Sequence, residues 1–251
     1  MVDDFAARGV EAPGLAVGPG RGDRVEGVGE GEDPGFERDL LALQAPRVTA
    51  AVVMLVVLQG DACRQLHQGL ASCPESLAER LPKAHLLTDA LCGAGAVQAT
   101  IAPSEAAWLG AVIGALSAAL GDQVAAMPRH LVHNDCHIGN IIFAACGAAG
   151  FIDFDFMRTN LRIFDPCYCL AGLLVDGLGH GLQAGRWIEL RESLLAGYDS
   201  SSSLQVAERA MITYVIWAAL LINAGWWVNA GRLDLAGANL CALQWLTSNR
   251  S

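Results

Sequence analysis

Basic side chains are scarce in this chain of 251 residues. It has 16 Lys+Arg against 26 Asp+Glu, lysine occurs only once, as Lys83, and the net charge is −10. A surface that binds nucleic acid electrostatically needs clustered Lys and Arg, so this composition argues against that class of protein. The 53% hydrophobic content excludes global disorder. The length is sufficient for one large domain or two small ones.

Two other patterns are missing. The amino terminus, Met1-Val-Asp-Asp, lacks the basic and then apolar pattern of a secretory signal. The cysteines contain no Cys-x-x-Cys pair, and we expect them to be reduced and to pack as small, mostly buried hydrophobic residues. A cytoplasmic location follows as the expectation. The eight cysteines are Cys63, Cys73, Cys92, Cys136, Cys146, Cys167, Cys169 and Cys241.

The negative charge is concentrated at one end of the chain. Residues 1–45 hold ten acids and four arginines, which accounts for −6 of the −10. The first 35 residues are also rich in glycine and proline and have hardly any periodic apolar pattern. We therefore predict loop or disorder there, with a short helix at 36–43.

Apolar patterns predict the elements that follow. The run 48–58 is rich in β-branched residues and predicts a buried strand, followed by a helix over 61–71. Another helix is expected to start at Ser104 as its N-cap and to stop at Gly121. Short strands are predicted at 131–132, 141–143 and 151–152, and helices at 166–175, 186–197, 205–230 and 233–247.

The segment 211–228 allows two interpretations. It is apolar apart from Thr213, Tyr214 and Asn223, and its length is close to that of a membrane span. No basic cluster flanks it, and Asn223 would lie unpaired in lipid. We therefore expect a buried core helix and no membrane partner.

The strongest chemical signal lies among the short strands. The sequence His133-Asn-Asp135-Cys-His137-Ile-Gly-Asn140 is followed by Ile-Asp153-Phe-Asp155. A His-x-Asp-x-x-x-x-Asn loop, followed after a hairpin by an Asp between apolar residues, is the arrangement that kinases use for phosphoryl transfer. One carboxylate orients the acceptor hydroxyl, while an amide oxygen and a second carboxylate hold Mg²⁺.

This motif, with the later Arg162-Ile-Phe-Asp165-Pro, resembles the aminoglycoside phosphotransferase superfamily, which also includes choline kinases and type II homoserine kinases. The usual loop has Gly where this chain has Asn134. The resemblance implies an α+β, predominantly helical fold: a protein-kinase-like carboxyl lobe with a short β-hairpin catalytic region and a reduced amino lobe. It divides the chain into a Gly/acid-rich segment or remnant amino lobe (1–46), a hinge strand (47–60), and the helical lobe (61–251) with its catalytic loop (131–155).

The same resemblance assigns roles and partners. Asp135 becomes the catalytic base. His133, Asn140 and Asp153 belong to the nucleotide and metal site, with Asn140 and Asp153 as Mg²⁺ ligands. The resemblance also implies ATP and Mg²⁺ as cofactors and a small-molecule hydroxyl as the substrate; the oligomeric state is not indicated. The remaining residues are Asp155, which assists the metal or the loop, and the structural residues His137 and Asp165, the latter as a loop anchor or helix N-cap.

Two alternatives stay open. Glycines such as Gly18 and Gly20 are not in a Gly-x-Gly-x-x-Gly register, and no lysine precedes the hinge. The chain is therefore also compatible with a catalytically impaired kinase-like remnant that acts as a binding protein. The alternation of His133, Asp135 and His137, with His130 and Asp153 nearby, further allows a zinc- or iron-dependent hydrolase.

Overall fold

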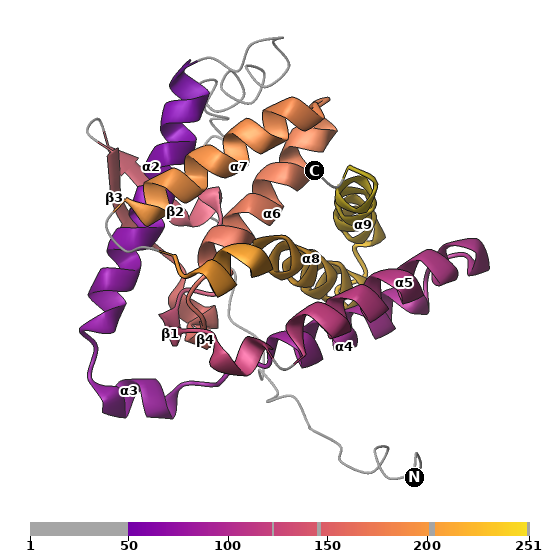
Figure 1. The fold of residues 1–251 in the computed structure, drawn as a ribbon, viewed down its shortest axis with the longest axis horizontal. Helices are drawn as coiled ribbons and strands as arrows, with labels where there is room; N and C mark the ends of the chain where they lie inside the picture. Colours follow the sequence, from indigo (N-terminus) through magenta and orange to yellow (C-terminus); the bar gives the residue numbers. More distant parts are fainter. Residues whose placement is uncertain (1–49, 122, 145–146, 201–203, 250–251) are drawn as a thin grey trace, which may run out of the picture. The chain divides into compact units, whose positions relative to one another are not determined.

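Helices make up most of the chain that the structure describes, and short strands are confined to its middle (Figure 1). The structure is a computed structural model that describes residues 50–121, 123–144, 147–200 and 204–249. These residues all belong to one compact unit within residues 35–251. The Gly-rich segment and the predicted helix at 36–43 lie outside the described residues. The described helices are α2 (Ala50–Ala71), α3 (Glu75–Arg80), α4 (Leu86–Gln98), α5 (Pro103–Leu120), α6 (Phe164–Gly179), α7 (Ala184–Asp199), α8 (Val206–Asn229) and α9 (Leu233–Ser248).

The strands form two antiparallel pairs, one nested inside the other along the chain. Strand β1 (Arg129–Val132) pairs with β4 (Arg158–Leu161), and β2 (Ile141–Ala144) pairs with β3 (Gly147–Phe151). The predicted strands at 131–132 and 141–143 are confirmed. The sequence did not predict β4, whose residues Arg-Thr-Asn-Leu are mostly polar. Pairing with β1 and a bridge between Lys83 and Thr159 hold β4 in an extended conformation.

Helix α8 lies in the middle of the core. It packs against α4, α6 and α9, and Trp217 on it is fully buried. In the described part of the chain, α5 and α8 are long and apolar enough to cross a membrane, and 61% of the most apolar stretch of α8 is buried inside the protein. The prediction that 211–228 forms a buried core helix is confirmed. The helices predicted at 166–175, 186–197, 205–230 and 233–247 are also present, as α6, α7, α8 and α9.

The predicted hinge strand at 47–60 is wrong within the described residues, because 50–60 belong to helix α2. Val56, Gly60, Cys63 and His67 are buried at intervals of three or four residues, which is the period of one helix face. That face packs along α7, the orange helix beside the indigo α2 in Figure 1. This tertiary contact outweighs the β-propensity of the valines, since propensity differences amount to less than about 1 kcal/mol per residue.

The start of α5 also differs from the expectation. The N-cap is Ala102, two residues before the predicted Ser104. Glu105 supplies the missing cap, since its carboxylate accepts a hydrogen bond from the backbone N–H of Ala102 at 3.1 Å. Pro103 fits the first turn because its missing N–H is not needed there. The predicted end of this helix at Gly121 is confirmed.

The close approach of α2 and α7 yields a stability test. A Cβ on Gly60 would collide with the backbone carbonyl oxygen of Leu194, whereas a Cβ on Gly69 of the same helix would meet open space. We expect Gly60→Ala to lower the free energy of unfolding by about 1–3 kcal/mol or more. Gly69→Ala, the matched control, should raise it by about 0.5–1 kcal/mol, because alanine favours helix. Urea unfolding measures both, and equal effects would show that α2 and α7 are not in contact.

Candidate active site

The loop between β1 and β2 brings Asp135 and Asn140 together. The Asn140 amide Nδ2 donates to the backbone carbonyl of Asp135 at 2.9 Å and to its carboxylate Oδ2 at 3.1 Å. Asn140 is only 6% exposed, so the pairing is protected from water. The amide nitrogen is used by Asp135, and the amide oxygen is therefore the atom that this side chain offers as a ligand.

Asp165 holds the start of this loop. One carboxylate oxygen accepts the backbone N–H of His133 at 2.8 Å, and the other accepts that of Asn134, also at 2.8 Å. Asp165 is fully buried. His67 of α2 contacts the same carboxylate, with its Nε2 2.9 Å from Oδ2, within hydrogen-bond distance. Hydrogen bonds to an ionised acceptor are stronger than neutral ones, so Asp165 fixes both backbone groups. The alternative role of helix N-cap is wrong, since Ile163 occupies that position.

Asn134 has a left-handed backbone with φ of 67°. Asparagine tolerates this conformation better than most residues, which explains how it replaces the glycine of the usual motif. Its side-chain oxygen accepts a hydrogen bond from Nδ2 of Asn160 at 2.9 Å. Asn160 is a buried residue of β4, so the unpredicted strand provides a second support for the loop.

Asp153 follows the hairpin in a strained turn. Its φ of 62° and ψ of 65° are left-handed, a conformation that costs about 1–3 kcal/mol for a residue other than glycine. The preceding Ile152 donates its N–H to the backbone carbonyl of Asn140 at 3.1 Å, and its own carbonyl lies 2.9 Å from Nε2 of the buried His133. These two hydrogen bonds tie the Asp153 turn to the Asp135 loop.

The loop and the turn face one cavity of about 580 Å³. Asp135, His137 and Asp153 line it, whereas Asp155 is exposed and is not among the lining residues. Nε2 of His137 lies 3.8 Å from the Asp135 carboxylate, and its Nδ1 accepts a hydrogen bond from Gly139 N. The imidazole thus stabilises the turn at the end of the loop.

Sequence reasoning missed the opposite wall of the cavity. It includes acidic and aromatic side chains among aliphatic ones, and Arg158 is the one arginine among the lining residues. Burial raises the pKa of Tyr168, and the neighbouring charge of Asp135 raises it further. Burial also raises the pKa of Asp176. These residues have no common sequence motif, because they come from separate helices and meet only in the folded protein. They are Asp89 of α4, Tyr168 and Asp176 of α6, and Asn223, Trp226 and Trp227 of α8.

The residues of the proposed hydrolase site do not converge. Within the described residues, His133, Asp135 and His137 do not bring their ligand atoms together around one point; the group of three ligand side chains that does so consists of Cys63, Cys136 and Cys169. His133 instead turns its ring toward the carbonyl of Ile152 and the aromatic ring of Phe154, 4.7 Å away between centroids. This geometry argues against a zinc- or iron-dependent hydrolase at the loop.

Comparison with known proteins gives consistent matches. A model of the phosphotransferase enzyme family matches residues 27–208. Homoserine kinases from Zymomonas mobilis and Gluconacetobacter diazotrophicus are 29% and 33% identical over 107 residues, which cover 41% of this chain and 32% of each relative. The chain therefore matches about a third of the length of these relatives.

Solved structures show the same fold. A glucosamine kinase has a TM-score of 0.62 at 17% identity, and the match covers 85% of this chain and 57% of that one. An amicoumacin kinase, solved with AMP-PNP, Ca²⁺ and its ligand, has a TM-score of 0.53 at 18% identity, covering 80% of this chain and 63% of that one. These likenesses identify the fold as kinase-like and predominantly helical.

His130, beside the Asp165 anchor, predicts a pH dependence of stability. Burial and the adjacent His67 ring lower the pKa of His130 from 6.5 to about 4. The unfolded chain binds this proton below pH 6.5 and the folded chain does not, so stability falls as the pH drops from 6.5 to about 4. We expect His130→Gln to remove about 1–2 kcal/mol of this loss, allowing for screening at a half-buried site.

The measurement is urea unfolding at several pH values between 4 and 7. His85→Gln is the matched control, because His85 is exposed, and its pH profile should follow that of the wild type. A His130→Gln profile that coincides with the wild type over this range would contradict the prediction.

Proposed function

Since the chain belongs to the phosphotransferase enzyme family, we propose that it transfers the γ-phosphate of ATP to a hydroxyl group of a small molecule, with Mg²⁺ as the metal. One observation carries this proposal. Asp135 and Asn140 are hydrogen-bonded to each other in a loop anchored by Asp165, and Asp153 lies on the same cavity as Asp135. This is the set of carboxylates and amide that phosphoryl transfer requires. The reaction would place the protein in the cytoplasm, where ATP is available.

Asp135 is proposed as the catalytic base. Its Oδ2 accepts the hydrogen bond from Asn140, and we propose that the carboxylate receives the proton of an acceptor hydroxyl. Half-burial at the cavity wall and the fixed loop keep the carboxylate in one orientation. Such positioning is the main contribution that a protein makes to phosphoryl transfer, because its transition state is loose.

Asn140 and Asp153 are proposed as the metal ligands. An amide oxygen and a carboxylate form a hard oxygen donor set, which fits Mg²⁺. The bound metal would neutralise charge on the transferred phosphate. The strained backbone of Asp153 supports this assignment, since left-handed conformations outside glycine concentrate at functional sites. Asp155 is exposed on the turn that follows, and we propose that it supports this turn rather than the metal.

The charge of the cavity lining favours a phosphate acceptor that carries an amine. Its lining includes four aspartates, Asp89, Asp135, Asp153 and Asp176, against one arginine. Trp226 adds an aromatic ring to the lining, and cations bind to aromatic faces. Homoserine and glucosamine, after which two of the similar kinases are named, each combine an amino group with a hydroxyl. We therefore propose an amino alcohol or amino sugar as the substrate.

The test is a phosphate-transfer assay with labelled ATP, Mg²⁺ and a panel of amino alcohols, amino sugars and neutral alcohols. We expect transfer to an amine-bearing acceptor. Asp135→Asn should lower kcat by about 10²–10⁴, the usual contribution of a general base, with little change in stability. Glu79→Gln, an exposed acid on α3, is the control and should keep the wild-type rate.

An unchanged rate in Asp135→Asn would refute the assignment of the base. The alternative is a kinase-like remnant that binds a partner without transferring phosphate. It is kept because the matches cover only part of the known kinases. Calorimetry with Mg-ATP tests it. Binding weaker than millimolar, together with no transfer to any acceptor, would favour a binding protein over an enzyme.

A further inference from the structure

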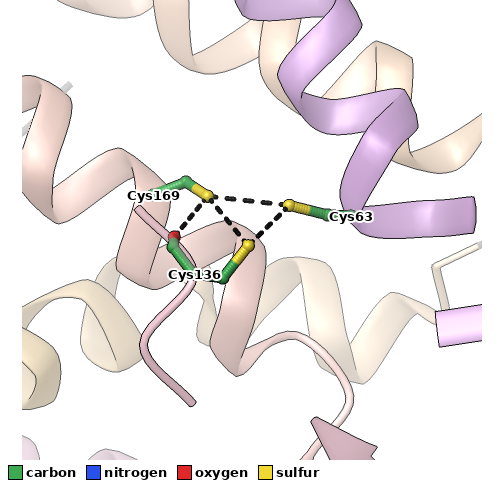
Figure 2. Close-up of side chains that lie close together, drawn as sticks. All are labelled: Cys63, Cys136 and Cys169. Carbon is green, nitrogen blue, oxygen red and sulfur yellow. Dashed lines mark hydrogen bonds between the residues drawn. The ribbon is translucent and has the colours of Figure 1, made fainter. Parts of the chain in front are cut away.

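Three cysteines from distant parts of the chain meet in the core, next to the catalytic loop. Figure 2 shows Cys63 on α2, Cys169 on α6 and Cys136 on the loop between them. The sulfur of Cys63 lies 3.2 Å from that of Cys136 and 3.6 Å from that of Cys169, and the third edge, Cys136 to Cys169, is also 3.6 Å. All three residues are at most 1% exposed. Their sulfurs therefore form a nearly regular, fully buried triangle.

The size of this triangle fits a metal ion bound to thiolates. Its edges place the point equidistant from the sulfurs about 2 Å from each, and a zinc–sulfur bond is about 2.3 Å long, so an ion would lie about 1 Å above the plane. An ideal tetrahedral zinc site has sulfurs about 3.8 Å apart, which needs an expansion of only a few tenths of an ångström. A disulfide, by contrast, would use two of the sulfurs and leave the third without a role.

Gln59 provides a second, independent observation. It lies one helical turn before Cys63 on α2, and its side chain is 0% exposed. Neither its amide nitrogen nor its amide oxygen has a hydrogen-bond partner among the described residues, although an unsatisfied buried amide costs about 1–3 kcal/mol. The amide lies beside the Cys169 side chain. Its oxygen is therefore suited to the fourth position of a site that the three sulfurs leave incomplete.

The surroundings favour a cation between the sulfurs. Uncompensated negative charge on thiolates in the core is costly, and a bound cation compensates it. Gln59 and Cys169 also line the 580 Å³ cavity, which gives an ion a route from solvent.

We propose that Cys63, Cys136 and Cys169 bind one thiophilic d¹⁰ metal ion, Zn²⁺ or Cu⁺, with Gln59 at the open position. Each thiol loses its proton as its sulfur binds the ion, and no oxidation occurs. Cys136 is the neighbour of Asp135 in the chain, so the ion joins α2 and α6 directly to the catalytic loop. The site is separate from the proposed Mg²⁺ site, whose donors are oxygens, because sulfur ligands select soft metals.

Cys167 offers a matched control on the same helix. It is as buried as Cys169, two residues away, but its sulfur lies 3.7 Å from the backbone carbonyl of Ile212 and outside the cluster. Cys167 is thus a small, buried hydrophobic residue, as the sequence predicts for most of the cysteines. A substitution there creates a comparable loss of core volume without touching the triangle.

The experiment uses the full chain, expressed without a metal-binding tag, in a background with Cys73, Cys92, Cys146 and Cys241 replaced by serine. Elemental analysis after gel filtration measures retained metal, and titrations with Zn²⁺ alone and with Cu⁺ alone under reducing conditions measure affinity. We expect about one ion per chain. Cys63→Ala and Cys169→Ala should lower the affinity by more than about 100-fold, since changes that only disturb the orientation of a ligand already cost about 10–100-fold. Cys167→Ala should bind as the background does.

Cobalt(II) keeps the proposal testable if the cluster variants fail to fold. The background protein should then show the intense sulfur-to-cobalt charge-transfer absorption of thiolate ligands, and Zn²⁺ should abolish it. Absence of that absorption, equal affinity in Cys169→Ala and Cys167→Ala, or a Cys63–Cys136 disulfide in protein isolated with its thiols blocked would each overturn the proposal. Metal content and cobalt absorption do not depend on phosphate transfer, so failure of the proposed function leaves this test intact.

Discussion

The buried carboxylate of Asp165 is the interaction on which the geometry of the proposed active site depends. It accepts two backbone N–H groups from the start of the proposed catalytic loop and one hydrogen bond from His67, all at 2.8–2.9 Å. The arrangement therefore joins α6, α2 and the loop at one charged centre in the core. Removing one partner of such a buried network leaves the others unsatisfied, which costs about 3–5 kcal/mol. The positions of Asp135 and Asn140 follow from this centre, because the loop that carries them begins at the two anchored residues.

The loop and the helices after it could be predicted from the sequence, whereas helix α2, strand β4 and the far wall of the cavity could not. The helices α6 to α9 have long periodic patterns, which determine helices reliably, and the His-x-Asp motif marks the loop by spacing alone. The valine-rich run at 48–58 predicts a strand, but its described part, 50–58, belongs to helix α2, which packs against α7. The polar strand β4 depends on its partner β1. The far wall of the cavity, with Tyr168, Asp176 and Trp226, is assembled from separate helices and has no local signature.

The three cysteines show how packing turns ordinary residues into a site. Their spacing in the sequence, 73 residues from Cys63 to Cys136 and 33 more to Cys169, suggests nothing beyond scattered buried thiols. The fold brings them together because the same elements, α2, the loop and α6, are already joined by Asp165 and His67. The proposed metal ion and the carboxylate thus act on the same part of the structure, one through thiolates and the other through hydrogen bonds.

The most direct test measures both the rate of phosphate transfer and the stability to urea in two variants, Asp165→Asn and Glu208→Gln. Both acids are 0% exposed, but Glu208 pairs with Arg162 and not with the loop. Both variants should lose stability in urea unfolding. At a temperature where both are folded, Asp165→Asn should lose about 100-fold or more in kcat, since small misplacements of reacting groups have such effects, while Glu208→Gln keeps a near wild-type rate. A folded Asp165→Asn protein that transfers phosphate at the wild-type rate would contradict the account.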